Sequence, residues 1–283
     1  MQRKNILISA EDLNREIDNP DVRVIDTRFS LFDSEEGKKA YNNCHIPNAI
    51  YAHLNHDLAS EITKSSGRHP LPDIDKISKL FSLWGISKST HIIVYDAHNS
   101  AIAARLWWLF RWLGHKNVSV LNGGFEAWLK LKYRTNNDIP SFTKGNFISK
   151  ANHNLILETD MISGWIQKKI PYILVDARDR ERFRGIKEPI DKVAGHIPNT
   201  INVPFTDFIN KNGTWKTLKA INKIWDKVKI SKNDEWGVMC GSGVTACHLA
   251  ISGLMVGMKE PSLYVGSWSE WITNKKRPIS TNE

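Results

Sequence analysis

The chain has 283 residues, of which 41% are hydrophobic and 24% charged, and it carries a formal net charge of +9. This length suits two domains that each bury a core, and the composition excludes a disordered chain. No apolar run approaches the roughly 18 residues that span a membrane, and the first residues lack the apolar core of a secretory signal. Lysines and arginines are scattered, so nucleic-acid binding is not expected, whereas an anionic small substrate is compatible with the charge. The three cysteines give no disulfide framework, and we therefore expect a cytoplasmic protein without a membrane partner.

In the first half of the chain, short apolar runs alternate with longer helical patterns. The runs are RVIDT (23–27), HIIVYD (91–96) and VSVLNG (118–123). Their β-branched residues predict buried strands of the parallel type. The stretches 75–85 and 100–115 have helical spacing and end at Gly85 and Gly114, residues that suit helix caps. Strands that alternate with helices predict an α/β fold with a central, mostly parallel sheet.

The second half repeats the first, motif by motif. VRVIDTR (22–28), HIPNAI (45–50) and GGFEAW (123–128) return as YILVDAR (172–178), HIPNTI (196–201) and GSWSEW (266–271). The matched aspartates Asp26 and Asp176 are 150 residues apart (176 − 26), and the matched histidines His45 and His196 are 151 apart (196 − 45). Several motifs in one order indicate a tandem duplication of one domain rather than a short-repeat array.

We therefore expect two similar α/β domains, residues 1–138 and 154–283, joined by a linker at 139–153. The linker region is rich in Asn, Pro, Gly and Ser and lacks apolar periodicity. In the second copy, strands are predicted at 172–177, 237–240 and 262–266, and a helix at 246–258. Ligands of parallel sheets bind just beyond the C-terminal ends of strands. The site is thus expected after residue 240, at the interface of the two domains.

The stretch VMCGSGVTACHL (238–249) places Cys240 at such a strand end, before a turn and a helix start. Gly241 and Gly243 can adopt positive φ, so that successive backbone N–H groups of the loop point inward. The helix adds its positive N-terminal end. Such a ring, completed by Ser242, Val244 and Thr245, would stabilise a thiolate, the nucleophilic form of cysteine. A buried structural cysteine is the commoner alternative, but it requires neither two glycines nor a helix start.

The matching place in the first copy reads YDAHNSAIAARL (95–106), where Asp96 replaces Cys240 and the glycines are absent. We interpret the first domain as catalytically inactive. A cysteine phosphatase would need an arginine at position 246 to close its phosphate loop, and that position is Ala246. Cys247 and its neighbour His248 match no familiar zinc spacing, so neither a metal nor a cofactor is expected. We expect both Cys44 and Cys247 to be structural.

Taken together, the tandem repeat, the DTR/DAR and HIP motifs and the loop CGSGVTAC resemble the rhodanese-like sulfurtransferases over nearly the whole chain. The resemblance implies that Cys240 takes a sulfane sulfur from a small-molecule donor as a persulfide. It implies transfer to a thiol acceptor, such as thioredoxin or a small thiol, or to cyanide. In that family, loops like CGSGVT are typical of 3-mercaptopyruvate enzymes, whereas thiosulfate enzymes carry basic residues there.

No Arg or Lys lies between Cys240 and Cys247, so the loop would offer a doubly charged donor only backbone dipoles. We therefore expect 3-mercaptopyruvate as the donor, with its carboxylate selected further out. Thiosulfate is the alternative donor. A non-catalytic rhodanese-like binding module is the rival class, which the presence of Cys240 disfavours.

The resemblance also implies roles for arginines. Arg178 is the structural partner of Asp176, and Arg182 is the arginine that binds the donor's carboxylate, for which a planar guanidinium fork is well suited. The family's second substrate arginine would stand where this chain has Ile190. The residues available to replace it nearby are Arg184, Lys187 and Lys192.

A serine-assisted step is a further implication of the resemblance. Ser242 matches the loop serine of the family, and His69 in GRHPLP matches a histidine that the first half supplies. The acidic partner of that histidine aligns with Asn55, and Asp57 lies two residues further on. A Ser–His–acid relay needs the acid to orient the imidazole, so the relay stays open.

Overall fold

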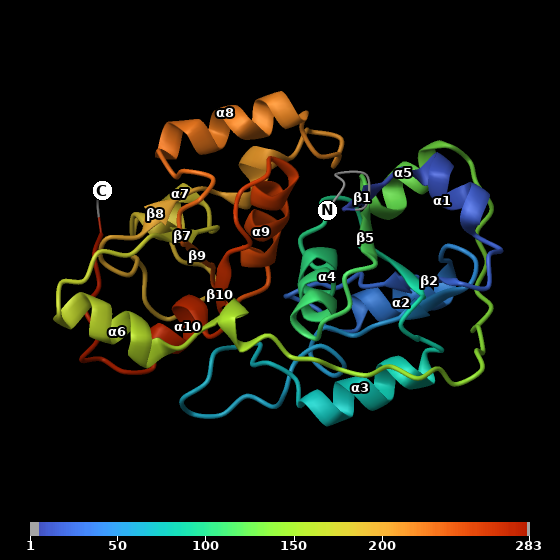
Figure 1. The fold of residues 1–283 in the computed structure, drawn as a ribbon, viewed down its shortest axis with the longest axis horizontal. Coiled ribbons are helices and arrows are strands. Elements are labelled where there is room, and N and C mark those ends of the chain that lie inside the picture. The colour runs from blue at the N-terminus through green and yellow to red at the C-terminus, as the bar shows by residue number, and fades with distance from the viewer. Residues whose placement is uncertain (1–5, 282–283) are drawn as a thin grey trace. The chain divides into compact units, whose positions relative to one another are not determined.

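A computed structural model describes residues 6–281, in which strands and helices alternate along the chain (Figure 1). The strands are β1 Leu7–Ile8, β2 Val22–Asp26, β3 Ala49–Tyr51, β4 His91–Tyr95, β5 Val118–Leu121, β6 Ile156–Leu157, β7 Leu174–Asp176, β8 Ile201–Asn202, β9 Gly237–Met239 and β10 Ser262–Tyr264. The helices are α1 Ala10–Glu16, α2 Glu36–Asn43, α3 Ile74–Leu83, α4 Ala103–Trp112, α5 Gly124–Lys130, α6 Thr159–Gln167, α7 Arg180–Phe183, α8 Leu218–Val228, α9 Ala246–Met255 and α10 Ser267–Trp271, with 3₁₀ turns η2 His153–Leu155 and η3 Phe205–Phe208. Among these helices, none is long and apolar enough to cross a membrane.

Two five-stranded sheets have the same strand order. The first runs β1-β5-β4-β2-β3 and the second β6-β10-β9-β7-β8, and neighbouring strands in both are parallel. Each strand of the second sheet thus takes the place of its counterpart in the first. The predicted α/β fold and the predicted duplication are both confirmed.

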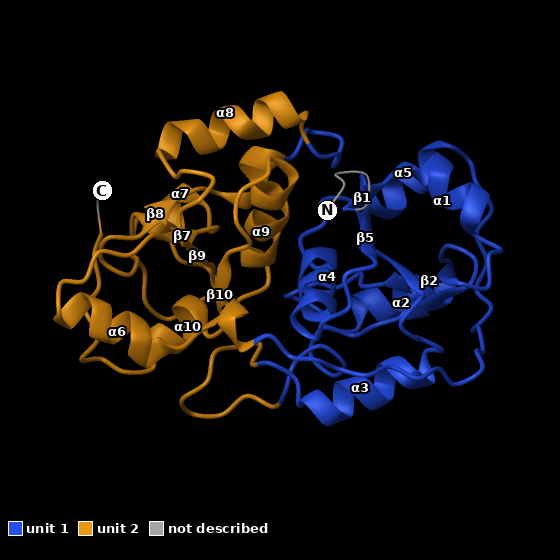
Figure 2. Ribbon diagram, viewed as in Figure 1, with its two compact units in different colours: residues 1–60, 71–152, 209–215 blue, residues 61–70, 153–208, 216–283 orange. Residues whose placement is uncertain are grey.

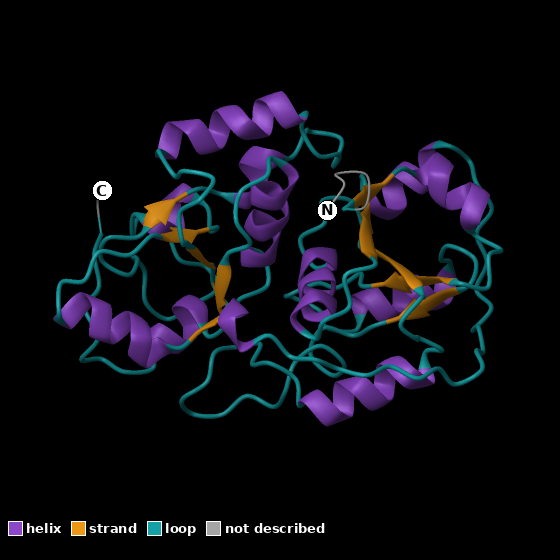
Figure 3. Ribbon diagram, viewed as in Figure 1, coloured by secondary structure: helices purple, strands orange, loops and turns teal. Residues whose placement is uncertain are grey.

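The long predicted elements are present, and the short edge strands are those the sequence missed. Helices α4 and α9 fall within the predicted stretches, and α3 begins one residue before its stretch. The chain turns left-handed after these helices at Gly85 (φ 72°), Gly114 (φ 89°) and Gly257 (φ 80°). Strands β1, β3, β6 and β8 have only two or three residues each. Strands β7, β9 and β10 are also only three residues long, but each lies in a longer stretch with apolar residues, YILVDA, GVMC or SLYVG, that indicates a buried strand. Figure 3 shows how much of the chain between the elements is loop.

Helix α4 illustrates how the core is built. Every residue from Ala103 to Trp112 is buried, which is the pattern of a helix enclosed on all sides rather than of an amphipathic surface helix. Its two arginines, Arg105 and Arg111, are buried with it, and the guanidinium of Arg111 lies 5.0 Å from the ring centroid of Trp107. The cation stacked on an aromatic face accommodates a charge inside an otherwise apolar layer.

The chain divides into two compact units, and each unit contains residues from both halves of the sequence (Figure 2). Unit 1 comprises residues 1–60, 71–152 and 209–215, and unit 2 comprises residues 61–70, 153–208 and 216–283. Each unit therefore includes a short segment from the other half of the chain. No motif or change in composition predicts this exchange.

The stretch expected to be a linker, 139–153, packs as part of unit 1 through residue 152. Phe147 is buried, and its ring lies 5.1 Å from that of Phe81. The N–H of Gly145 donates to the carbonyl of Ser82 at 2.8 Å. A buried aromatic ring and paired backbone groups hold the stretch down, although it lacks the apolar periodicity of a helix or strand.

Candidate active site

Cys240 follows β9 directly, at the C-terminal end of the central strand of the unit 2 sheet. Its side chain is buried, and its backbone is fixed on both sides. The Cys240 N–H donates to Oγ of Ser267 at 3.1 Å, and its carbonyl accepts from the N–H of Trp268 at 3.0 Å. The carbonyl of Gly241 accepts from the N–H of Ser269 at 2.9 Å. The start of the loop is therefore held by the turn that opens α10.

The two glycines of the loop are required for different reasons. Gly243 has a φ of 73°, and a Cβ atom there would lie 2.5 Å from the carbonyl oxygen of Val265. Gly241 lies outside the left-handed region, contrary to the expectation for it. A Cβ atom at Gly241 would instead lie 2.8 Å from Nη2 of Arg68. Gly243 provides the left-handed turn, whereas Gly241 leaves room for the side chain of Arg68.

The matching loop of unit 1 holds an anion. The buried carboxylate of Asp96 accepts hydrogen bonds from the backbone N–H groups of Ser100 (3.0 Å), Ile102 (2.9 Å) and Ala103 (3.2 Å). Burial raises the pKa of Asp96, and these amides act in the opposite direction. This connection between strand and helix thus forms a ring of donors around a side chain placed where Cys240 stands in unit 2.

In unit 2 the loop that follows Cys240 has backbone N–H groups that no side chain occupies. The backbone N–H groups of Ser242, Val244 and Thr245 have no acceptor among the described residues. Helix α9 begins next, at Ala246. Unpaired amides at a helix start favour an anion, so the loop is suited to a thiolate or persulfide on Cys240.

Ser242 and His69 are brought together, as the sequence suggested. Oγ of Ser242 lies 2.8 Å from Nδ1 of His69, and both side chains are buried. His69 belongs to the segment 61–70, which is part of unit 2. In that segment, a Cβ atom on Gly67 would lie 2.5 Å from the carbonyl oxygen of Gly266. Close backbone approach at a glycine therefore docks the segment beside the loop.

The acidic candidates for a relay lie in unit 1. Oδ2 of Asp57 accepts from the backbone N–H of His53 at 2.7 Å, and burial raises the pKa of Asp57. Asn55 is exposed, and its N–H donates to Nδ1 of His53 at 3.1 Å. Both residues form hydrogen bonds with His53 in the turn that begins there. The Ser–His–acid relay therefore stays a prediction in which no acidic residue is assigned to His69.

Arg182, expected to bind the donor, reaches the loop from α7. Its Nη2 lies 3.3 Å from the position of a Cβ atom on Gly241. Its Nε donates to both oxygens of Glu188 at 2.9 Å, and Nη2 donates to Oδ2 of Asp191 at 3.0 Å. Arg182 is therefore held by two acidic side chains. Arg184, the second candidate, follows α7 and is exposed.

Arg178 forms the structural ion pair that was expected of it. Its Nη2 lies 2.7 Å from Oδ2 of Asp176, with both side chains buried, and its guanidinium stacks 4.7 Å from the ring of Trp268. Unit 1 repeats the arrangement with Arg28 and Asp26 at 2.7 Å. The HIP histidines are structural as well: Nδ1 of His196 lies 2.7 Å from the carbonyl of Phe183, and Nδ1 of His45 lies 2.8 Å from that of Tyr41.

Arg68 is the site residue that sequence reasoning missed. Its Nη1 forms an ion pair with Oδ1 of Asp191, and its Nη2 faces Gly241. Burial lowers the pKa of Arg68, and the charge of Cys240 acts against that shift. The expectation that the loop meets only dipoles was wrong, because two guanidiniums reach it. The signal was present in GRHPLP, where a cation directly precedes the predicted histidine.

The remaining cysteines pack as expected. Cys247 on α9 is buried, and its thiol donates to the carbonyl of Gly243 at 3.4 Å. The carbonyl of Cys44 accepts from Nη2 of Arg28 at 2.7 Å. All three cysteines are free.

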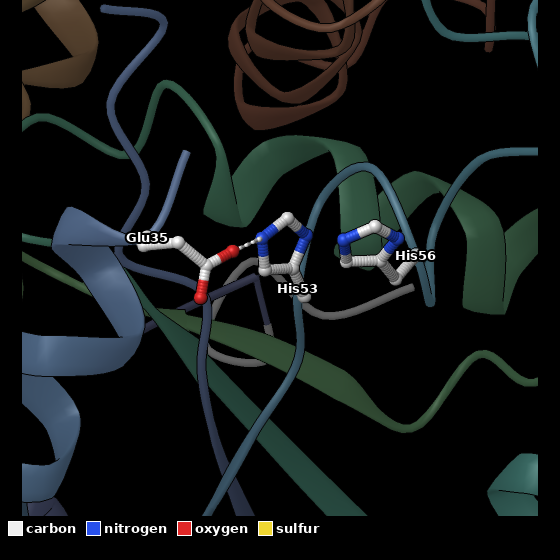
Figure 4. Close-up of side chains that lie close together, drawn as sticks. All are labelled: Glu35, His53 and His56. Carbon is white, nitrogen blue, oxygen red and sulfur yellow. Dashed lines mark ion pairs between the residues drawn. The ribbon is translucent and has the colours of Figure 1, made fainter. Parts of the chain in front are cut away.

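A separate cluster in unit 1 joins Glu35, His53 and His56, whose ligand atoms lie within 4.8 Å of one another (Figure 4). Both ring nitrogens of His53 are already paired: Nδ1 accepts from the N–H of Asn55, and Nε2 lies 3.1 Å from the carbonyl of Ser34. The rings of His53 and His56 pack at 4.2 Å, 34° apart. A metal ion would have to replace one of these hydrogen bonds, so the cluster is better described as a packed turn.

Comparison with known proteins places the chain in one family. The rhodanese-like domain model matches residues 9–131 and 161–274. A probable 3-mercaptopyruvate sulfurtransferase from Pseudomonas aeruginosa is 36% identical, covering 98% of both chains, and a thiosulfate sulfurtransferase from Rattus norvegicus is 32% identical, covering 93% of this chain and 89% of the other. The structure of 3-mercaptopyruvate sulfurtransferase from Leishmania major matches with a TM-score of 0.85 at 26% identity, over 98% of this chain and 77% of that one. The chain is thus a tandem member of the rhodanese-like domain family.

Proposed function

We propose that this protein is a sulfurtransferase that moves a sulfur from 3-mercaptopyruvate, through a persulfide on Cys240, to a thiol or to cyanide. The observation that carries the proposal is a buried cysteine at a strand end, followed by a loop in which the N–H groups of Ser242, Val244 and Thr245 have no acceptor among the described residues. The relatives named as 3-mercaptopyruvate and thiosulfate sulfurtransferases support the class of reaction. Cys240 makes a purely structural binding module the weaker alternative.

In the proposed first step, the Cys240 thiolate attacks the thiol sulfur of the donor. A new S–S bond forms while the donor's C–S bond breaks, and the electron pair of that bond passes into the enolate of pyruvate. The enolate takes up a proton to give pyruvate, and Cys240 is left as a persulfide. The loop amides and the start of α9 stabilise the negative charge on sulfur through this step.

In the second step, an acceptor removes the outer sulfur and restores the Cys240 thiol. Cyanide attacks that sulfur to give thiocyanate, and a thiol acceptor leaves carrying a persulfide. Neither step oxidises or reduces the protein overall, so no cofactor enters the scheme. The nucleophile in each step is an anion or thiolate.

Ser242 and His69 are suited to the enolate oxygen. In the tautomer whose Nδ1 carries the proton, His69 donates to Oγ of Ser242 across 2.8 Å. The hydroxyl proton of Ser242 is then available to the donor's carbonyl oxygen, where charge develops as the C–S bond breaks. This role requires only that His69 orient the serine. It does not require an acidic third residue.

Charge balance favours the keto acid over thiosulfate. Arg68 and Arg182 bring two guanidiniums to the loop, but the carboxylates of Glu188 and Asp191 balance their charges. The N–H donors of a guanidinium can still bind a single carboxylate, because the two groups form a pair of parallel hydrogen bonds. A dianion such as thiosulfate gains less there because little net positive charge is left. The donor's carboxylate also lies several bonds from its sulfur, whereas thiosulfate keeps both charges beside the sulfur under attack.

Steady-state kinetics with both donors test the proposal. We expect kcat/KM for 3-mercaptopyruvate to exceed that for thiosulfate by at least about 10-fold, which equals about 1.4 kcal/mol of transition-state stabilisation. Arg182→Ala should mainly raise KM for the keto acid, because a carboxylate contact persists from ground state to transition state. Thiosulfate as the equal or better donor would refute the donor assignment and leave the sulfurtransferase class intact.

A further inference from the structure

The guanidiniums of Arg68 and Arg182 lie over the same point of the active-site loop. Nη2 of Arg68 is 2.8 Å, and Nη2 of Arg182 is 3.3 Å, from the position of a Cβ atom on Gly241. A larger residue at Gly241 would meet both. The glycine therefore lets N–H donors of two arginines approach the loop next to Cys240.

Two like charges this close need an anion between them, and Asp191 supplies it. Its Oδ1 pairs with Nη1 of Arg68, and its Oδ2 lies 3.0 Å from Nη2 of Arg182, with the carboxylate 4% exposed. One carboxylate thus bridges the two guanidiniums. Because charge-assisted pairs of this kind depend on geometry, the bridge demonstrates that the two arginines are spaced to bind a carboxylate jointly.

Arg68 keeps donor capacity after it has served Asp191. A guanidinium has five N–H groups. Nη1 of Arg68 is paired with Asp191, Nη2 faces Gly241, and Nε is buried without a hydrogen-bond acceptor among the described residues. A buried donor without an acceptor is costly. An anionic substrate beside Gly241 would provide the acceptor that Arg68 lacks.

We propose that Arg68 is a specificity-determining residue, which with Arg182 forms a two-arginine clamp for the carboxylate of the keto-acid donor. This inference rests on the proposed function, because it names the second carboxylate partner in the same site. Arg68 supplies the cation that Ile190 does not, from a position 172 residues before Cys240 (240 − 68). Asp191 is the positioning residue that keeps the two guanidiniums together.

The test compares donors with and without a carboxylate in the full-length protein. Arg68→Ala should raise KM for 3-mercaptopyruvate about 10- to 100-fold, the effect expected when hydrogen bonds to a charged group are lost. For mercaptoacetone, which keeps the thiol and the ketone but has no carboxylate, kcat/KM should change less than about twofold. Arg68→Lys should recover part of the loss, because the ammonium keeps the charge but not the planar fork.

Arg180→Ala is the matched control. Arg180 lies on the same short helix as Arg182, but its guanidinium is exposed and pairs with Asp207. This variant should keep the wild-type KM for 3-mercaptopyruvate. Circular dichroism should show that all variants are folded.

Equal losses with both donors in Arg68→Ala would overturn the clamp and assign Arg68 to holding His69 in place. An unchanged KM for 3-mercaptopyruvate in Arg68→Ala would overturn it as well. Failure of the proposed function looks different: the wild-type protein itself would then use no keto-acid donor. The two failures are therefore distinguishable in one set of assays.

Discussion

Asp96 and Cys240 stand at the same place in two copies of one loop, and each determines what its copy can do. In unit 1, three backbone N–H groups donate to the Asp96 carboxylate. That anion is covalently fixed, so the loop has no donors left for a sulfur that arrives and leaves. In unit 2 a cysteine occupies the position, and a thiolate can accept a sulfur and release it. The prediction that the first copy is inactive therefore rests on one side chain rather than on a different fold.

Cysteine replacements test this assignment at the level of single residues. Cys240→Ser should abolish turnover, because a hydroxyl is not ionised at neutral pH and cannot carry a persulfide. Cys44→Ser and Cys247→Ser should retain most of it, since neither side chain takes part in the loop's chemistry. The measurement is the rate of thiocyanate or pyruvate formation, together with mass spectrometry of the protein after donor addition. A comparable loss in Cys247→Ser would point to a two-cysteine redox cycle instead.

The candidate site residues that stand in recognisable motifs were predictable from the sequence, whereas Arg68 was not. Cys240, Ser242 and His69 stand in stretches whose chemistry is readable, and the Ser242–His69 contact is present. Arg68 lies in the other half of the chain from Cys240. No spacing rule connects residues that far apart, because only the docking of the segment 61–70 brings them together. Its adjacency to His69 was the one available clue.

At the scale of elements, the loop 240–245 and α9 depend on the left-handed turn at Gly243. The sequence marked this turn correctly because glycine is the default residue for positive φ. Positive φ was predicted for Gly241 as well, but this position requires a glycine because a Cβ atom would contact the guanidiniums of Arg68 and Arg182. The long helices were predictable from their periodicity and the inner strands from their apolar runs, whereas the edge strands have no such run around them. Local sequence patterns therefore predict the inner strands of the two sheets better than their edge strands.

Alanine replacements separate the roles of the glycines. Gly257→Ala, with positive φ but open space around it, should lower the free energy of unfolding by about 1–2 kcal/mol. Gly243→Ala adds a clash with the Val265 carbonyl and should cost about 3 kcal/mol or more. Gly241→Ala should cost less stability and raise KM for the keto acid. Urea titrations and donor kinetics provide the measurements, and equal costs at Gly243 and Gly257 would contradict the role given to Val265.

At the scale of the whole molecule, the two units exchange short segments. Residues 61–70 belong to unit 2 and carry Arg68 and His69, while residues 209–215 belong to unit 1. In unit 1, Nε1 of Trp215 donates to Oγ of Ser100 at 3.2 Å, and its N–H donates to Oδ1 of Asn122 at 2.9 Å. Unit 2, which we propose to be the catalytic one, therefore includes ten residues from the first half of the chain.

Displacing the segment 61–70 should remove activity without unfolding either unit. In Gly67→Val, a side chain would meet the carbonyl oxygen of Gly266, so the segment must shift and carry Arg68 and His69 with it. We expect kcat/KM to fall at least about 10-fold, as for other losses of positioning, with little change in circular dichroism. Gly164→Ala, on α6 with open space around it, is the control that should keep full activity. Full activity in Gly67→Val would show that the docking of this segment is unnecessary.

The exchange of segments also has a consequence for how the protein is made on the ribosome. A chain that emerges from its N-terminus would ordinarily complete its first domain before the second is synthesised. Here unit 1 ends its continuous stretch at residue 152 but needs residues up to 215. The intervening 63 residues (215 − 152) take about 3–13 s at the usual ~5–20 residues per second. Residues 61–70, in turn, await a sheet that does not yet exist. Neither unit can therefore form all of its contacts until segments from both halves of the chain have been synthesised. If the two halves were expressed as separate chains, each chain would have to bind the segment that the other one carries.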